Sequence, residues 1–448
     1  MAMANQLRNK LCSVVSVAAV LLVLYNAAAH VWLQRDAACV PAPPPPPPPS
    51  CEPCAQPPRA APPADPLAAL DMRLGRWDGA RAYRLFDYAA VGSRYASLGG
   101  SRRVCLATQS SVERLHELLA LAAHWSGPLS VAVFVTGDEL RALRGFAAWL
   151  LRCRPAVWAR LALHVGTPAA RPGAAGGALP GWARDCAQPP PAPRRRADTV
   201  AWRATHPYPQ NHLRNLARKN CHGSHVLLLD IDVVPSRGLA PALERFLRAA
   251  PRCPLCVYVV PTYELDRRVR AFPSDKAELV RLSRKKLAVP FHKKSFSLSQ
   301  RASNFSRWEA SGGNESAETH VSHNVTNFEL FYEPFYLAPD SVPAHDERFL
   351  GYGFTRNTQT YEMFLSGYQF QVLSPVFTAH WGIRQAGQIP WWRRKEIAVN
   401  WKLFKTFKRE LFARHGKELI ENFQDAVTHG LDYRNTSVGM GNFSVSMK

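Results

Sequence analysis

The sequence contains no Walker phosphate-binding loop, no zinc-finger pattern and no signature of a nucleic-acid-binding module. Acidic side chains are also scarce, with 34 Asp and Glu against 56 Lys and Arg in 448 residues, a formal net charge of +22. The missing motifs exclude P-loop chemistry and argue against nucleic acid as a partner. The basic excess favours other anions, such as a membrane surface, nucleotide phosphates or acidic glycans.

Residues 11–33 carry no Asp, Glu, Lys or Arg, whereas Arg8 and Lys10 precede them. The length suits one membrane span, and the basic flank predicts a cytosolic N-terminus. A cleaved signal peptide is the alternative, because Ala27-Ala28-Ala29 could serve as a cleavage site. Residues 34–66 are proline-rich and predict an extended spacer. The expected order is a cytosolic tail (1–10), a transmembrane signal-anchor (11–33), a stem (34–66) and a lumenal domain (67–448).

Ten cysteines include one in the apolar segment, which leaves an odd number in the lumenal part. Cys51-x-x-Cys54 and Cys253-x-x-Cys256 resemble halves of a zinc ribbon. We reject zinc because the first pair lies in a proline tract and an oxidising lumen favours disulfides. The secretory route agrees with five Asn-x-Ser/Thr sequons, at Asn304, Asn314, Asn324, Asn435 and Asn442.

Apolar runs alternate with helical patterns through the lumenal part, which predicts an α/β fold with a mostly parallel sheet and helices on both faces. The expected strands are 104–108, 129–135, 159–165, the run before Asp230, 256–262 and 370–377. Ser110-x-x-Glu113 predicts a capping box in front of a helix. Further helices are expected at 138–151, from Pro209, and at 239–249, 275–286 and 391–414. Residues 295–323 have little periodicity and are expected to form an exposed loop.

Asp230 and Asp232 stand at the end of the buried run 226–229. Alternation along a strand would place both carboxylates on one side and Ile231 in the core. Acids at the carboxyl end of a parallel strand lie where open α/β sheets bind ligands, and two such groups suit Mg²⁺ or Mn²⁺. An acid pair that caps turns or binds Arg237 is the equally weighted alternative.

Three other sites carry polar side chains of interest. Arg214 and Arg218 share one face of the helix that leads to Asp230, so this face could overlook a nucleotide or could be solvated. Asp346 and Glu347 precede a glycine-flanked aromatic turn, and one of them could act as a general base or pair with Arg348. His380 follows an apolar strand and would be a third metal ligand if that strand neighbours the acids.

Together these pieces resemble glycosyltransferase family 49. The matching segments run in order over residues 103–415 and are 106–108, 125–131, 208–218, 230–236, 304–308, 346–354 and His380. The resemblance implies a GT-A fold with a Rossmann-like sheet, a UDP-sugar donor and Mn²⁺. It implies Asp230, Asp232 and His380 as metal ligands, Asp346 as base with Glu347 in reserve, and a Cys153–Cys186 disulfide. Residues implied to bind the nucleotide sugar are Asn211, Arg214, Asn215 and Arg218.

The family further implies an inverting transfer of glucuronate from UDP-glucuronate to a terminal β-xylose, in β-1,4 linkage, on an O-mannosyl-type glycoprotein glycan. It implies a Golgi type II membrane protein, with a homodimer or a complex with other Golgi glycosyltransferases as its assembly. His212, Thr355 and Trp381 depart from the family pattern, which leaves the donor and acceptor open. The alternatives are another UDP-sugar or acceptor, such as N-acetylglucosamine, and a non-catalytic Golgi partner subunit.

Overall fold

The computed structural model describes residues 20–28, 65–174, 176–311, 318–387 and 390–416. The chain divides into two compact units between Ala61 and Pro62, and the second unit is described here. Residues 20–28, inside the expected anchor, are helical. The expected tail, most of the stem, Cys51, Cys54 and three sequons lie outside the described residues. No helix among the described residues combines the length and the apolar character needed to cross a membrane.

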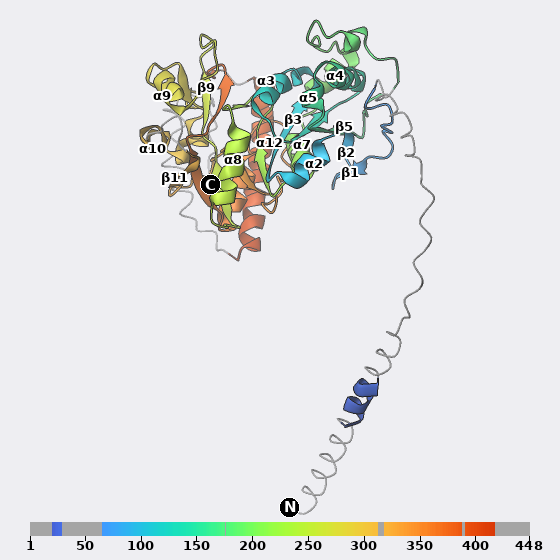
Figure 1. Cartoon of the computed structure of the whole chain (residues 1–448). Helices are drawn as coiled ribbons and strands as arrows, with labels where there is room; N and C mark the ends of the chain where they lie inside the picture. Colours follow the sequence, from blue (N-terminus) through green and yellow to red (C-terminus); the bar gives the residue numbers. More distant parts are fainter. Residues whose placement is uncertain (1–19, 29–64, 175, 312–317, 388–389, 417–448) are drawn as a thin grey trace, which may run out of the picture. The chain divides into compact units, whose positions relative to one another are not determined.

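A ten-stranded sheet forms the centre of the domain (Figure 1). In spatial order its strands are β1 (Arg76–Trp77), β2 (Tyr83–Val91), β5 (Leu161–Pro168), β4 (Leu129–Phe134), β3 (Val104–Ser111), β6 (His225–Leu228), β12 (Tyr336–Pro339), β8 (Cys256–Val259), β13 (Gln369–Ser374) and β11 (His320–Asn324). The neighbours β5, β4, β3 and β6 are parallel, as predicted, and so are β8 and β13. Strand β12 runs antiparallel between β6 and β8, which the sequence did not indicate.

A second, four-stranded sheet has the order β10 (Ala288–Pro290), β9 (Thr262–Leu265), β14 (Thr378–Trp381) and β7 (Val234–Pro235). The predicted strands 256–262 and 370–377 correspond to β8 and β13, which end at Val259 and Ser374, and the chain then continues into β9 and β14 of the small sheet. Pro261 and Pro375 lie at these breaks, and proline cannot donate to a strand ladder. Each broken strand therefore leaves the large sheet and continues in the small one.

Helices cover both faces of the large sheet, as predicted. The helices of the described domain are α2 (Tyr95–Ser101), α3 (Glu117–His124), α4 (Glu139–Cys153), α5 (Pro155–Trp158), α6 (Ala197–Thr205), α7 (Gln210–Lys219), α8 (Leu239–Ala249), α9 (Lys276–Arg284), α10 (Phe305–Ala310), α11 (Asn357–Leu365) and α12 (Trp391–Arg414). Alternation along β3 sorts its side chains between the faces. Val104 and Leu106 pack with α3, α4 and α8, whereas Cys105 and Ala107 pack with α7.

Two local predictions are wrong. Strand β3 continues through Ser111 into a 3₁₀ turn, η1 (Val112–Arg114), so Ser110 caps no helix, and Glu113 pairs with Arg195 instead. The expected exposed loop 295–323 contains 3₁₀ turns η3 (Ser297–Ser299) and η4 (Arg301–Ser303), helix α10 and the start of β11. Trp308 of α10 is fully buried, and its indole N–H donates to the Leu373 carbonyl at 2.8 Å.

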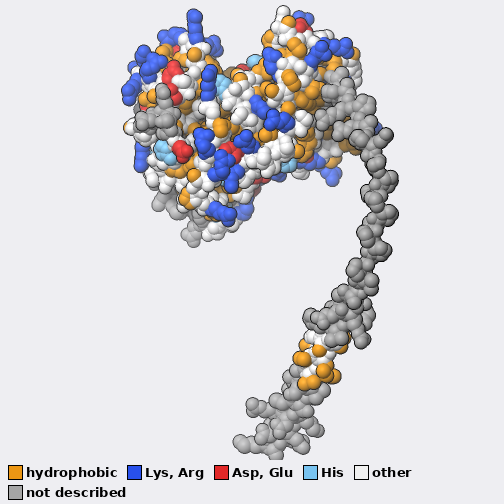
Figure 2. Space-filling model, in the orientation of Figure 1, with side chains coloured by type: hydrophobic (Ala, Val, Ile, Leu, Met, Phe, Trp, Pro, Cys, Tyr) orange, Lys and Arg blue, Asp and Glu red, His pale blue; other side chains and the backbone are white. Residues whose placement is uncertain are grey.

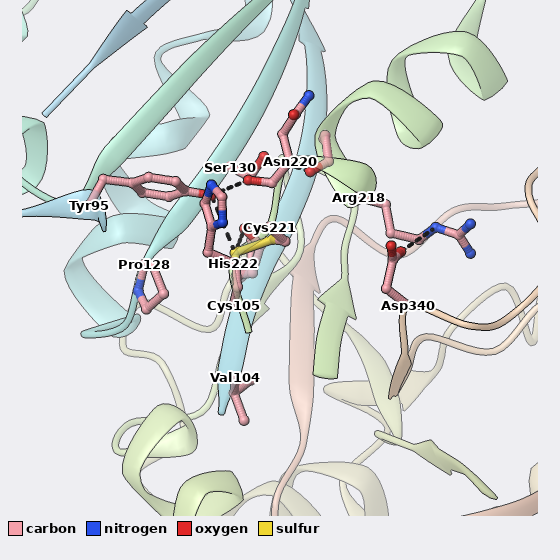
Figure 3. The surroundings of a disulfide bond; sticks show 12 residues. Tyr95, Val104, Cys105, Pro128, Ser130, Arg218, Asn220, Cys221, His222 and Asp340 are labelled. Atoms are coloured by element: carbon pink, nitrogen blue, oxygen red, sulfur yellow. Dashed lines mark hydrogen bonds and ion pairs between the residues drawn. A yellow bond between two sulfur atoms is a disulfide. The ribbon is translucent and has the colours of Figure 1, made fainter. Parts of the chain in front are cut away.

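Three disulfides connect the described cysteines. Cys153–Cys186 is the predicted pair, and Cys253–Cys256 confirms a disulfide in place of zinc. Cys105–Cys221 was not predicted; it joins β3 to the segment between α7 and β6 (Figure 3). This bond spans 116 residues of sequence and so constrains a large part of the domain.

Replacing Cys105 and Cys221 together by Ala is expected to lower the free energy of unfolding by about 5 kcal/mol, because the bond closes a long loop in the unfolded chain. The same replacement at Cys253 and Cys256, which are 3 residues apart, should cost about 2 kcal/mol. Urea unfolding of both variants under identical oxidising conditions measures the difference. Equal losses would contradict the loop-length argument.

Candidate active site

Asp230 and Asp232 lie in a turn directly after β6, at the carboxyl edge of the parallel strands. The strand ends at Leu228, and the backbone N–H of Val233 donates to the Asp230 carbonyl at 3.0 Å. The expected strand alternation is therefore wrong, although Ile231 is buried as predicted. Because a turn and not a strand carries the acids, the two carboxylates meet different partners.

The Asp232 carboxylate is nearly buried and is surrounded by cationic groups. It accepts a hydrogen bond from Arg114 at 2.7 Å, and His380 Nε2 lies 3.2 Å and Arg384 Nη2 3.7 Å from the same oxygen. Burial by itself would raise the pKa of Asp232, but the His380 hydrogen bond and the Arg114 charge outweigh it and hold the pKa well below its usual value. Asp232 is therefore ionised at neutral pH.

The Asp230 carboxylate faces two buried arginines. Arg356 donates to it at 2.7 Å, and Arg214 Nη2 lies 3.6 Å away. Burial opposes ionisation, yet the charges of Arg356 and Arg214 lower the pKa of Asp230 overall. Burial and the Arg356 charge lower the pKa of Arg214 to about 10, which still leaves it charged at neutral pH. Four guanidinium groups thus gather around the two acids, an arrangement suited to an anionic ligand.

His380 reaches Asp232 because β14 pairs with β7, the short strand that follows the aspartate turn. The strand of His380 therefore neighbours the acids, the condition under which the sequence predicted a third ligand. His380 Nδ1 is buried and finds no hydrogen-bond partner among the described residues. The imidazole therefore faces Asp232 through Nε2, and within the described part of the chain its other nitrogen is left unpaired.

Two carboxylates and an imidazole are the donor types that Mn²⁺ accepts. Asp232 and His380 lie together, whereas Asp230 faces Arg356. Within the described residues, no three His, Cys, Asp or Glu side chains form a group that could hold a metal ion. The side-chain types of Asp230, Asp232 and His380 suit a divalent ion. Their role as metal ligands stays a prediction.

The four residues of α7 that were predicted to bind the nucleotide sugar are all buried, and three of them hold the loop that carries Asp346. Asn211 donates to the Asp346 carbonyl at 2.9 Å, and Asn215 exchanges hydrogen bonds with the His345 backbone at 2.8 and 2.9 Å. Arg218 donates to the Pro343 carbonyl and pairs with Asp340 at 3.3 Å (Figure 3). Arg214 is the member of this set whose side chain reaches the aspartate turn.

The two candidate bases have different surroundings. Asp346 accepts hydrogen bonds from Arg348, which also pairs with Glu410 of α12, so the alternative of an internal Asp–Arg pair is realised here. Glu347 accepts from Asn215 at 3.0 Å and lies 3.6 Å from His212 Nε2. Among the described residues, no hydrogen bond links Asp346 or Glu347 to Asp230 or Asp232. The catalytic role of Asp346 and Glu347 therefore stays a prediction.

Sequence reasoning missed Arg114, Arg356, Arg384 and Glu333. Burial raises the pKa of Glu333, and the charges of Arg356, Arg214 and Asp230 all act on this carboxylate. Arg114 had a usable signal, because it follows the carboxyl end of a parallel strand. The other three had none, since turns distant in the sequence bring them to the site. Figure 2 shows that Lys and Arg also outnumber Asp and Glu on the visible face.

Comparison with known proteins places this chain in a family. A family model described as "Glycosyl-transferase for dystroglycan" matches residues 103–416. Beta-1,4-glucuronyltransferase 1 of Danio rerio is 30% identical over 356 residues, which are 76% of this chain and 82% of that protein. The Homo sapiens protein of the same name is 34% identical over 321 residues, 70% of this chain and 76% of that protein.

Solved structures are more distant. The crystal structure of GalNAc-T7 with UDP, GalNAc and Mn²⁺ aligns with a TM-score of 0.38 and 7% identity, over 73% of this chain and 57% of that one. This value is too low to assign a fold or a site. The family model covers well over half of this chain, and both curated relatives are at least 30% identical and covered over more than two thirds of their length. The chain therefore belongs to glycosyltransferase family 49 and is a UDP-sugar-dependent glycosyltransferase.

Proposed function

We propose that this protein is an inverting, Mn²⁺-dependent glucuronyltransferase. It moves glucuronate from UDP-glucuronate to a terminal β-xylose, in β-1,4 linkage, on an O-mannosyl-type glycoprotein glycan. Support for glucuronate and for the linkage comes from the names of the relatives. The family description supports a glycan of dystroglycan type.

The observation that carries the proposal is the aspartate turn with its surrounding cations. Two ionised carboxylates, an imidazole and four guanidinium groups lie at the carboxyl edge of the parallel strands. The donor brings a diphosphate and a uronate, so it carries two separate anionic groups. A site with this excess of positive charge favours such a donor over one with a neutral sugar.

Each residue then has a defined role in the transfer. A carboxylate on the 346–347 loop takes the proton of the acceptor hydroxyl, whose oxygen forms the new bond to C1 of the sugar. The bond from C1 to the phosphate oxygen breaks on the opposite face, and UDP leaves with the electron pair. Asp230, Asp232 and His380 would hold the metal ion, which when bound neutralises charge on the diphosphate. Arg214 and Arg356 keep Asp230 ionised and in place.

The same proposal includes the cellular setting. The apolar segment 11–33 and its basic flank support a single N-terminal span in the Golgi membrane, with the catalytic domain in the lumen. The disulfides of the described domain agree with an oxidising compartment. A homodimer, or a complex with other Golgi glycosyltransferases, is the proposed assembly.

The test is UDP release by the purified full-length protein with Mn²⁺, across a panel of UDP-sugars, with and without a β-xyloside. We expect release from UDP-glucuronate that the β-xyloside stimulates and that chelation of the metal abolishes. Release from a different UDP-sugar would keep the reaction type and overturn the donor. A folded protein that releases UDP from no donor would favour a non-catalytic partner subunit.

A further inference from the structure

Arg384 differs from the other arginines at the aspartate turn in how its guanidinium group is held. Arg214 and Arg356 are buried against Asp230, and Arg114 donates directly to Asp232. Arg384 lies 3.7 Å from Asp232, beyond hydrogen-bond distance, and its side chain is 42% exposed. Its guanidinium group is thus free on one side to bind another anion.

His292 and Phe291 fix the orientation of the Arg384 guanidinium group, and Glu264 holds its backbone. Its backbone N–H donates to the Glu264 carboxylate at 3.0 Å, and its Nη1 donates to His292 Nε2 at 2.6 Å. Its guanidinium carbon also lies 5.2 Å from the centre of the Phe291 ring. Burial, followed by the Arg384 charge, lowers the pKa of His292 to about 3, so this imidazole is neutral and can accept. A guanidinium oriented in this way loses little freedom when it binds a ligand.

His292, which orients Arg384, has an unusual backbone conformation. His292 adopts a left-handed conformation with φ of 60°, which is uncommon for a residue other than glycine. In this conformation the His292 ring stacks on the Phe291 ring, with ring centres 4.0 Å apart. His292 Nε2 then accepts the hydrogen bond from Arg384. Strained residues of this kind cluster at binding sites, where the surrounding structure maintains them.

We propose that Arg384, oriented by His292 and Phe291, binds the carboxylate of the donor sugar and selects UDP-glucuronate over neutral UDP-sugars. The inference rests on the proposed function. The donor carries two anionic groups, and the cations in direct contact with Asp230 and Asp232 lie where the diphosphate is expected. Arg384 lies in the segment that follows β14 and supplies the separate guanidinium that the second anion needs. Planar guanidinium and carboxylate groups form paired hydrogen bonds.

The experiment measures the affinities of the full-length protein for UDP, UDP-glucuronate and UDP-glucose in the presence of Mn²⁺, by titration calorimetry. For Arg384→Gln we expect the affinity for UDP-glucuronate to fall about 10- to 100-fold, as for a lost charge-assisted hydrogen-bonded pair. The affinities for UDP and UDP-glucose should stay within about threefold, which also shows that the variant is folded. Arg384→Lys should recover part of the loss, because it restores the charge without the planar fork.

Two further variants complete the design. His292→Ala should weaken UDP-glucuronate binding less than Arg384→Gln does, because the guanidinium group remains but loses its orientation. Arg268→Gln is the matched control, since Arg268 is exposed and pairs with Asp266. An equal loss of affinity for UDP and UDP-glucuronate in Arg384→Gln would assign Arg384 to the diphosphate and overturn the inference.

Binding measurements on the wild-type protein distinguish failure of this inference from failure of the proposed function. Binding of UDP without a preference for UDP-glucuronate overturns the role of Arg384 and leaves transfer from another UDP-sugar standing. Absence of any UDP binding overturns both. A preference for UDP-glucuronate that Arg384→Gln leaves unchanged overturns the role of Arg384 alone.

Discussion

Replacing Asp232 by Asn is expected to lower UDP release from the donor about 100- to 1,000-fold. The carboxylate is nearly buried, ionised and central to the contacts with Arg114, His380 and Arg384. Asn keeps the size of the side chain but removes the charge that a divalent ion requires. The measurement is the initial rate of UDP release with Mn²⁺ at saturating donor.

A matched control distinguishes lost chemistry from general damage. Asp266→Asn removes an acid that pairs with the exposed Arg268, and it should leave the rate unchanged. The pKa of Asp232 is lowered, so the carboxylate stays ionised above its unfolded-state pKa of about 3.9. The deficit of Asp232→Asn should therefore be constant between about pH 5 and pH 8. A variant that retains the wild-type rate would exclude Asp232 from catalysis.

Replacing Trp308 by Ala is expected to lower the free energy of unfolding by about 3–5 kcal/mol. The indole is fully buried, lies 5.8 Å from the Tyr263 ring and donates to the Leu373 carbonyl. Its removal leaves a cavity between α10 and the sheet, and it leaves a buried carbonyl without its partner. Urea unfolding followed by circular dichroism measures the change.

The control for this substitution is Trp391→Ala, at the start of α12. The side chain of Trp391 is 70% exposed, so its loss should change the free energy of unfolding by at most about 0.5 kcal/mol. Similar losses for the two tryptophans would mean that burial does not explain the effect. Activity of the Trp308 variant at low temperature should stay near that of the wild type, because in the described part of the chain the hydrogen bond and ring contacts of the Trp308 indole are with Leu373, Tyr263 and Lys276, away from Asp232.

The α/β class and the parallel strands β3, β4, β5 and β6 followed from apolar runs that alternate with helical patterns. Helices α8 and α12 were predicted within a residue of their bounds, since their apolar residues and flanking prolines and glycines act locally. The position of Asp230 and Asp232 was predictable too, because acids that follow a buried parallel strand lie at the carboxyl edge of the sheet. Local pattern determined these features.

Tertiary structure decided the rest. Pro261 and Pro375 break two strands, but the four-stranded sheet that results forms only through pairing between segments far apart in the chain. That pairing brings His380 to Asp232, and a turn following it brings Arg384. Trp308 lies in a segment without periodicity, and its burial depends on the neighbouring strand β13.

The charged groups around Asp230 and Asp232 likewise depend on the tertiary structure. Arg356 and Arg214 face Asp230 because α7 and the turn before α11 meet there, and most of the polar face of α7 is used to hold the Asp346 loop. By itself the sequence determined the fold class and the place of the two acids after a buried strand, because strand and helix periodicities and strand-end acids are local. Only the tertiary structure decided which cations surround each carboxylate, because Arg114 and Arg356 lie more than a hundred residues away in sequence from the acids they contact.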